Sequence, residues 1–450
     1  MDLLSGSIRK TYFSYLAAAF GSAMVSSIYT IVDMAVVGQY EGSMGPAALA
    51  VVAPVWNIIY SLGLLMGVGG SVLFSTIRGE SGNGRESEDR LMYRSSEMFT
   101  ASVIGAAVLA LLSWGVVFFF EEPLLQAFGA DDSLMPLALR YLEPVRFVVP
   151  SFLLVQMLAA FLRNDGNPGL ATAGVVAGGI FNVFGDIFFV FGLNLGVYGA
   201  GLATAIGSVI SLLVMASHFF SRKNTLRLVR VHHLFRTLIR ICVTGFPTFF
   251  SDVAMGILTI LFNRQIIRYF SNDALSIYGI IINISTLVQC SAYSIGHASQ
   301  PLFSVNYGAG KGSRIKETLR YALMTSAAFG LIWTGICEGF PDGFVYIFMK
   351  PTEQILQVAP SIIRPYAVSF LLLPLNIFST YYFQALMKPA DAFTVSVGRG
   401  LVLSGILILI LPALFGGSAL WWSMPVTELV IFMYSALRMK RHTSLLLKDQ

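Results

Sequence analysis

Carboxylate and amide side chains occur inside long apolar runs of this chain, where a charged group is costly. Asp186 follows Asn182 by four residues in one run, so both side chains lie on one face of a helix. Asp33 lies in another run, with no basic residue within a helical turn. A carboxylate in a bilayer must be paired, hydrated or protonated. These residues therefore indicate a site for a proton or a hard cation such as sodium.

Other polar residues in the apolar runs indicate a functional site less clearly. Thr204 can add a hydroxyl oxygen to the Asp186 site, although such a hydroxyl often bonds back to its own helix. Asp252 follows Pro247, which can break a helix, and its carboxylate suits either a cavity or the membrane interface. Further candidates for a substrate cleft, on helical position alone, are Asn57, Met157, Tyr382 and Gln384.

Two pairs of opposite charges favour structural roles. Arg399 and Glu428 lie in neighbouring apolar runs and are expected to form a buried ion pair. Glu143 and Arg146 lie three residues apart and are expected to pair along one helix.

The composition places these residues in a membrane. The 450 residues are 56% hydrophobic and only 12% charged, whereas a soluble domain has roughly 25% charged residues. About twelve spans of roughly 25 residues fit this length. The expected helices cover residues 11–37, 46–74, 95–119, 137–161, 168–192, 198–220, 241–262, 274–303, 318–337, 358–386, 392–414 and 417–437.

Short motifs repeat between the two halves of the chain. Phe74-Ser75-x-x-x-Gly79 recurs as Phe303-Ser304-x-x-x-Gly308, and Pro168 with Gly179 recurs as Pro389 with Gly400. The sequence therefore predicts an all-α integral membrane protein with twelve transmembrane helices in two pseudo-symmetric six-helix lobes. The expected lobes are residues 1–220 and 241–450, joined by a cytoplasmic linker at residues 221–240.

The distribution of charge predicts the orientation. Lys and Arg concentrate in alternate loops and in the linker, which places both termini in the cytoplasm. The net charge of +5 is spread over these loops and does not indicate nucleic-acid binding. The three cysteines lie far apart and favour neither disulfides nor a zinc site. No nucleotide-binding, protease or hydrolase motif occurs, so we expect neither an enzyme nor a cofactor.

Several segments together resemble the multidrug and toxic compound extrusion (MATE) family, most nearly its bacterial multidrug-exporter branch. The resemblance covers nearly the whole chain. It is carried by Tyr29-Thr-Ile-Val-Asp33 with Val37-Gly38, Arg163-Asn-Asp-Gly-Asn-Pro168, Asn182-x-x-x-Asp186, Gly196-Val-x-Gly199-Ala200 with Ala203-Thr204, Gln300-Pro301 with Asn306-Tyr307-Gly308-Ala-Gly-Lys311, and Gln384-Ala385-Leu386-x-Lys388-Pro389.

The resemblance implies an inner-membrane antiporter of a bacterium that exports amphiphilic, cationic small molecules in exchange for protons or sodium by alternating access. It assigns the coupling cation, with sodium as one option, to Asp33, Asn182, Asp186 and Thr204. The chain departs from many members at Ala18, where they carry a proline, and it has no acidic residue within 366–386.

Two alternatives remain open at this stage. One is a flippase for lipid-linked precursors from the same superfamily, and the other is a membrane receptor or scaffold without transport. The expected partners are small-molecule substrates and the lipid bilayer, with no nucleic acid and no obligatory protein partner.

Overall fold

The structure is a computed structural model that describes residues 3–42, 44–83, 86–270, 272–348 and 352–448. Residues 1–2 of the first predicted lobe and residues 449–450 of the second lie outside the described residues. All regular elements in the described residues are helical. This follows from the sequence, because a backbone in lipid must satisfy its own hydrogen bonds and a helix does so within one segment.

In the part of the first half that the structure describes there are six long helical segments, with the short helix α4 between the third and the fourth. Their bounds are α1 (Ile8–Glu41), α2 (Met44–Gly79), α3 (Glu88–Phe119), α4 (Glu121–Ala127), α5 (Met135–Val145) continuing into α6 (Val149–Asn164), α7 (Pro168–Asp186) with the π-helical turn η3 (Ile187–Gly192), and α8 (Val197–Ala216) with the short turn η4 (Ser217–Phe220).

The second half follows the same order. Its bounds are α9 (Leu234–Tyr269), α10 (Asn272–Gly308), α11 (Gly312–Gly339), α12 (Pro341–Phe348), α13 (Glu353–Ala367) continuing through η5 (Val368–Leu371) into α14 (Leu373–Ala385), α15 (Pro389–Val397) continuing through the π-helical turn η6 (Gly398–Val402) into α16 (Leu403–Phe415), and η7 (Gly417–Trp422) with α17 (Ser423–Lys448).

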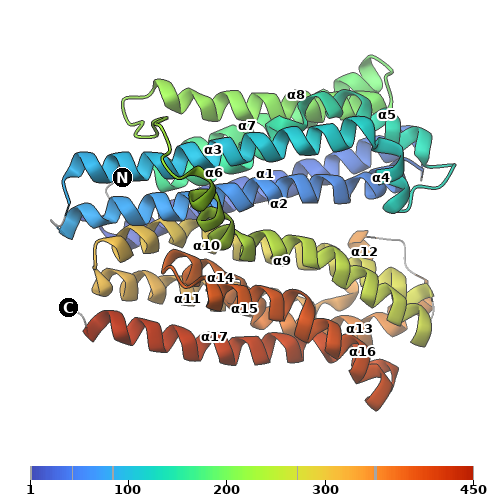
Figure 1. Ribbon diagram of the computed structural model, residues 1–450. Helices are drawn as coiled ribbons and strands as arrows, with labels where there is room; N and C mark the ends of the chain where they lie inside the picture. The colour runs from blue at the N-terminus through green and yellow to red at the C-terminus, as the bar shows by residue number, and fades with distance from the viewer. Residues whose placement is uncertain (1–2, 43, 84–85, 271, 349–351, 449–450) are drawn as a thin grey trace. The chain divides into compact units, whose positions relative to one another are not determined.

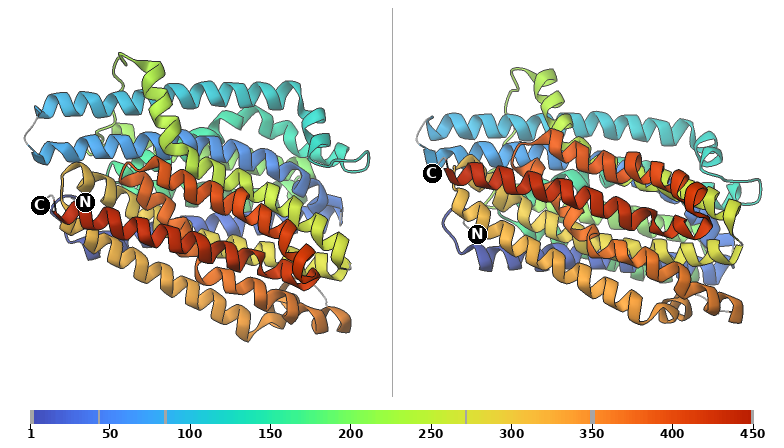
Figure 2. Two further views of the ribbon diagram at one scale, coloured as in Figure 1. Left: turned by 60° about the horizontal axis from the view of Figure 1, so that its bottom comes forward. Right: turned by 90° about the horizontal axis from the view of Figure 1, so that it is seen from below.

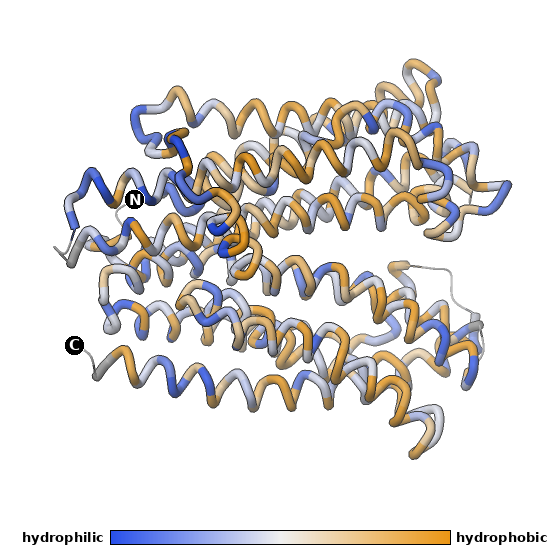
Figure 3. The backbone as a smooth tube through the Cα atoms, viewed as in Figure 1, coloured by the Kyte–Doolittle hydropathy of each residue, from blue (hydrophilic) through white to orange (hydrophobic). Residues whose placement is uncertain are grey.

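Among the described residues, 11 helical segments are long and apolar enough to span a membrane, or 12 if α11 and α12 form one span bent by 83°. Figure 3 colours the helix shafts mainly hydrophobic and many of the connecting loops hydrophilic. Large apolar side chains on the shafts are exposed, such as Leu112, Phe184 and Leu437, as expected for surfaces that face lipid. The prediction of an all-helical membrane protein is confirmed.

The chain packs as two compact units. Unit 1 comprises residues 1–3 and 17–249, and unit 2 comprises residues 4–16 and 250–450. Within each unit the long helices run side by side (Figures 1 and 2). The division falls inside α1 and α9, so it differs from the predicted lobes 1–220 and 241–450. Those boundaries rest on the apolar runs and the basic linker in the sequence, and they stay a prediction.

Each unit has its own apolar core. In unit 1 one core cluster includes Val36, Val52 and Leu142, and in unit 2 one includes Phe262, Ile281 and Trp421. Residues 4–16 belong to unit 2, where the Tyr12 hydroxyl lies 2.5 Å from the Thr325 hydroxyl. The interior of each unit is therefore mainly apolar. The buried polar residues described below are exceptions to that pattern.

Two local expectations are wrong. Helix α9 continues through Pro247 without a break, so the proline does not divide it. The pairing of Glu143 with Arg146 does not form along a helix, because α5 ends at Val145 and a short 3-10 turn begins at Arg146. Arg146 instead forms an ion pair with Glu121 at 3.2 Å.

Candidate functional site

Unit 1 brings together five polar side chains from four of its helices. The Tyr141 hydroxyl on α5 donates to Asp33 Oδ2 on α1 at 3.1 Å and lies 3.2 Å from the Thr204 hydroxyl on α8. Asn182 Nδ2 on α7 donates to Thr204 Oγ1 at 2.9 Å. Asp186 is fully buried one turn further along α7, and its carboxylate interacts electrostatically with that of Asp33. We call these residues the unit 1 cluster.

The hydrogen bonds of the unit 1 cluster have one consistent direction. Thr204 Oγ1 accepts from Asn182, so its own hydrogen is available to the Tyr141 oxygen. Tyr141 in turn gives its hydrogen to Asp33 Oδ2. The chain of donors therefore ends on Asp33 Oδ2, which accepts, and it leaves Asp33 Oδ1 unengaged.

Four oxygens of the unit 1 cluster are buried without a hydrogen-bond partner: Asp33 Oδ1, Asn182 Oδ1 and both carboxylate oxygens of Asp186. Native structures leave few such atoms, and each one calls for a reason. Carboxylate and amide oxygens are suitable ligands for a hard cation, and a carboxylate also accepts a proton. The oxygens of Asp33, Asn182 and Asp186 therefore fit an exchangeable proton or sodium ion.

Small residues position the unit 1 cluster by letting α7 and α8 approach closely. A Cβ added at Gly178 would overlap the Gly207 carbonyl oxygen and Ser211 Oγ. A Cβ at Gly185 would lie 2.9 Å from the Ala203 methyl group. Contacts this short require glycine. They bring Asn182 within reach of Thr204, and the π-helical turn η3 begins directly after Asp186, a distortion common at functional sites.

Unit 2 also buries a carboxylate, with every oxygen satisfied. Glu428 is fully buried on α17. Its Oε1 accepts from Arg399 Nε at 2.7 Å, and its Oε2 accepts from Asn376 Nδ2 at 2.7 Å. Ser435 donates to Asn376 Oδ1 at 3.4 Å. Arg399 lies in the π-helical turn η6. We call these four residues the unit 2 cluster, in which the cation is a side chain.

The remaining candidates lie in different environments. Asp252 is half-buried on α9 and accepts a hydrogen bond from the Tyr293 hydroxyl at 2.9 Å. Tyr382 and Gln384 are fully buried in unit 2, and the Tyr382 hydroxyl lies 2.8 Å from that of Thr443. In unit 1, Met157 is buried and Asn57 is exposed. Their assignment to a substrate cleft stays a prediction.

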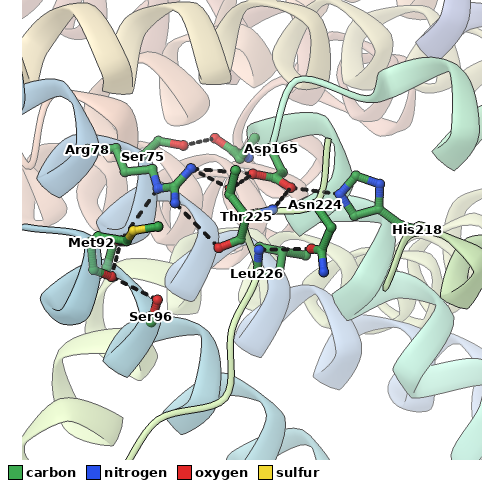
Figure 4. A network of polar contacts seen from close by, with 11 residues as sticks. Ser75, Arg78, Met92, Ser96, Asp165, His218, Asn224, Thr225 and Leu226 are labelled. Carbon is green, nitrogen blue, oxygen red and sulfur yellow. Dashed lines mark hydrogen bonds and ion pairs between the residues drawn. The ribbon is translucent and has the colours of Figure 1, made fainter. Parts of the chain in front are cut away.

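The structure adds residues that sequence reasoning missed. Tyr141 bridges the two halves of the unit 1 cluster, and no spacing in the sequence singles out this tyrosine. Asp165 in unit 1 and Asp391 in unit 2 are both buried carboxylates that contact a histidine and an arginine. Figure 4 shows the Asp165 network. The motif Arg163-Asn-Asp-Gly-Asn-Pro168 contains Asp165, but its partners are distant in the sequence.

Comparison with known proteins identifies relatives over almost the whole chain. A profile described as MatE matches residues 18–188 and 247–410. Multidrug export protein MepA of Staphylococcus saprophyticus is 24% identical over 410 residues, covering 91% of this chain and 88% of that protein. MepA of Staphylococcus aureus strain NCTC 8325 is 26% identical over 413 residues, covering 90% and 87%.

Solved structures share the fold. The outward-facing conformation of a multidrug resistance MATE family transporter of the MOP superfamily has a TM-score of 0.88 at 20% identity, covering 99% of this chain and 98% of that chain. The MATE multidrug transporter DinF-BH in complex with R6G has a TM-score of 0.86 at 24% identity, covering 98% of each chain. Together with the profile match, these likenesses assign the protein: it is a multi-pass membrane transporter of the MATE family and not an enzyme.

Proposed function

We propose that this protein exports amphiphilic organic compounds from a bacterial cell and takes up protons or sodium in exchange. The curated relatives are named as multidrug export proteins and come from bacteria, which supports the substrate class and a cytoplasmic-membrane location. The concentration of basic residues in alternate loops and in the linker supports a topology with both termini in the cytoplasm.

One observation carries the coupling step. The unit 1 cluster holds two buried carboxylates, and four of its buried oxygens have no partner. Neither Asp33 nor Asp186 forms an ion pair within the described residues. A proton or a sodium ion removes negative charge there, so occupancy of the unit 1 cluster changes the energy of the conformation that holds it. Antiport follows when the conformations that bind cation and substrate best are different.

The residues of the cluster have separate tasks in this proposal. Asp186 and Asp33 carry the charge that the cation neutralises. Asn182 supplies a neutral oxygen and holds Thr204 through its amide nitrogen. Tyr141 and Thr204 fix the Asp33 carboxylate by hydrogen bonds. The same oxygens suit a proton and a sodium ion, so the experiment must separate the two ions.

Efflux of R6G from energised bacterial cells tests the function, because the structural relative DinF-BH is described in complex with R6G. We expect cells with the wild-type protein to expel R6G and cells with Asp33→Asn to retain it. The control is Glu122→Gln, which removes an exposed carboxylate from α4 of the same unit and is expected to leave efflux unchanged. Loss of efflux on collapsing only the sodium gradient, or only the proton gradient, identifies the coupling ion.

Full efflux by Asp33→Asn would remove the unit 1 cluster from the mechanism. Absence of R6G efflux from both proteins would overturn the proposed substrate class and favour the alternative of a lipid-linked precursor flippase. That alternative is tested directly with fluorescent lipid-linked precursors in proteoliposomes.

A further inference from the structure

The linker, residues 221–240, follows η4, includes the first residues of α9 and carries charge of one sign. Its charged side chains are all basic, and no Asp or Glu occurs within it. The exposed members are Arg222, Lys223, Arg227, Arg230, Arg236 and Arg240. Figure 1 shows this segment leaving the end of α8 and running back across α3 to the start of α9. Such a segment either repels itself in water or meets negative charge outside the protein.

The beginning of the linker is fixed to unit 1 through a buried carboxylate. Asp165 Oδ2 accepts from the Thr225 backbone nitrogen at 3.1 Å and lies 2.7 Å from His218 Nε2. The Thr225 hydroxyl donates to Asp165 Oδ1 and accepts from Arg78. Arg78 also lies 3.5 Å from Asp165 Oδ1. Figure 4 shows these side chains converging from α2, η4 and the linker.

The middle of the linker is fixed along α3. The Val229 backbone nitrogen donates to Thr100 Oγ1 at 3.0 Å, and the Tyr93 hydroxyl donates to the Arg230 carbonyl oxygen at 2.7 Å. The His232 backbone nitrogen donates to Glu97 Oε1 at 3.2 Å. Backbone groups of Val229, Arg230 and His232 therefore bond to α3, while the side chains of Arg227 and Arg230 remain exposed. Hydrogen bonds to Asp165 and to α3 thus fix the backbone of the linker at residues 225–232.

Large apolar side chains are exposed beside these bases. Phe220 is 93% exposed, Phe235 79%, Leu228 69% and Ile239 48%. Figure 3 colours this part of the chain as a mixture of hydrophilic and hydrophobic stretches. Exposed aromatic and aliphatic groups interleaved with Arg and Lys are typical of segments that lie in the boundary between lipid headgroups and acyl chains.

We propose that the linker binds anionic phospholipids of the phosphatidylglycerol type. The arginine side chains contact the headgroup phosphates, and the apolar side chains enter the acyl-chain boundary beside them. Charge complementarity selects an anionic lipid, since a zwitterionic headgroup neutralises its own phosphate. The exposed apolar groups select a membrane surface over a soluble anion. The anchors to Asp165 and α3 hold the arginines in place before lipid arrives, which lowers the entropy cost of binding.

Lipid retention by the purified protein tests this proposal. The full-length protein is equilibrated in detergent micelles with equal amounts of phosphatidylglycerol and phosphatidylcholine of identical acyl chains, and retained lipids are counted by native mass spectrometry. We expect the wild type to retain phosphatidylglycerol in preference. Each basic side chain removed weakens that preference by roughly fivefold, so Arg227→Gln with Arg230→Gln should lower it by roughly 25-fold.

The matched control is Lys316→Gln with Arg320→Gln, which removes two exposed bases from α11 in unit 2 and is expected to keep the preference. Thermal melting shows whether each variant is folded, and Arg222→Gln with Lys223→Gln replaces the first variant if it is not. An unchanged lipid ratio in a folded linker variant, or an equal loss in the control, would overturn the proposal. This test does not depend on drug export, so its failure and that of the proposed function are separate.

Discussion

The two units each bury a carboxylate cluster beside a π-helical turn, and they neutralise it differently. In the unit 2 cluster, Glu428 has Arg399 at 2.7 Å and Asn376 at 2.7 Å. In the unit 1 cluster, both oxygens of Asp186 and one oxygen of Asp33 have no partner. In unit 2 the positive charge beside the carboxylate is thus a side chain, Arg399. In the unit 1 cluster no side chain supplies a positive charge.

The comparison separates two uses of buried charge. A permanent ion pair fixes neighbouring helices and strongly destabilises the protein when one partner is removed. A carboxylate without such a partner must obtain its cation from outside, and it can release that cation again. The repeated motifs align Gly178 of unit 1 with Arg399 of unit 2. At this helix position, unit 1 has a glycine that packs closely against Gly207. Unit 2 has the arginine that pairs with Glu428.

The largest expected difference lies in transport. Under the proposed mechanism, Asp186→Asn removes a charge that the coupling cation neutralises, so we expect R6G efflux to fall to the level of cells without the protein. Folded yield should stay at the wild-type level, because a buried carboxylate without partners costs about 1–3 kcal/mol or more. Efflux assays and size-exclusion profiles check both parts. An efflux-competent Asp186→Asn would place the coupling charge elsewhere.

The converse behaviour is expected for the unit 2 cluster. Arg399→Met leaves Glu428 buried without its cation and should destabilise the protein by about 3–5 kcal/mol. Adding Glu428→Gln should recover much of this loss, because both charges are then gone. Thermal melts of the two single variants and the double variant give the coupling energy. Equal stability of Arg399→Met and the wild type would show that the pair is not structural.

The approach of α7 to α8 can be tested without touching a polar group. Gly178→Val places side-chain atoms against the Gly207 carbonyl and Ser211, and overpacking of this kind costs about 2 kcal/mol. It should also separate Asn182 from Thr204 and reduce efflux. Gly115→Ala in α3, where a Cβ meets nothing within 4 Å, is the control. Comparable losses in both variants would indicate a general intolerance of substitution.

The buried aspartates at the helix ends offer a second contrast. Asp165 holds the linker, whereas Asp391 contacts Arg438 and His442. Asp165→Asn should weaken the linker contacts by about 1.5 kcal/mol and make trypsin cleave the linker faster. Asp391→Asn should leave that cleavage rate unchanged. Faster cleavage in both variants would mean that the two networks act on the linker alike.

The smallest effect is expected at Tyr141. Tyr141→Phe removes one hydrogen bond to Asp33, worth about 1 kcal/mol, and leaves both carboxylates in place. Efflux should fall several-fold while its ion dependence is kept. A change of coupling ion in this variant would show that the Tyr141 hydroxyl is itself a ligand of the cation. It would then add a fifth oxygen to the four unpartnered oxygens of the unit 1 cluster.

Parts of this account follow from the sequence, and parts need the fold. Helical periodicity placed Asn182 and Asp186 on one face, and the structure puts both on α7 with the Asn182 amide on Thr204. Tyr141 could not be found in this way, because its role depends on the packing of α5 against α8 and α1. Arg146 pairs with Glu121 and not with Glu143, because a 3-10 turn begins at Arg146 and the spacing of an α-helix does not apply across it.

Infrared difference spectroscopy of the purified protein tests the central claim most directly, because it detects the C=O band of a buried carboxyl group as it gains or loses a proton. Acidification should produce such a band in the wild type, and sodium should suppress it if sodium competes for the unit 1 cluster. The band should weaken in Asp186→Asn, be absent when Asp33→Asn is added to it, and be present in the double variant Arg399→Met with Glu428→Gln. A band that survives Asp186→Asn and Asp33→Asn, or one that disappears in the double variant, would contradict the account.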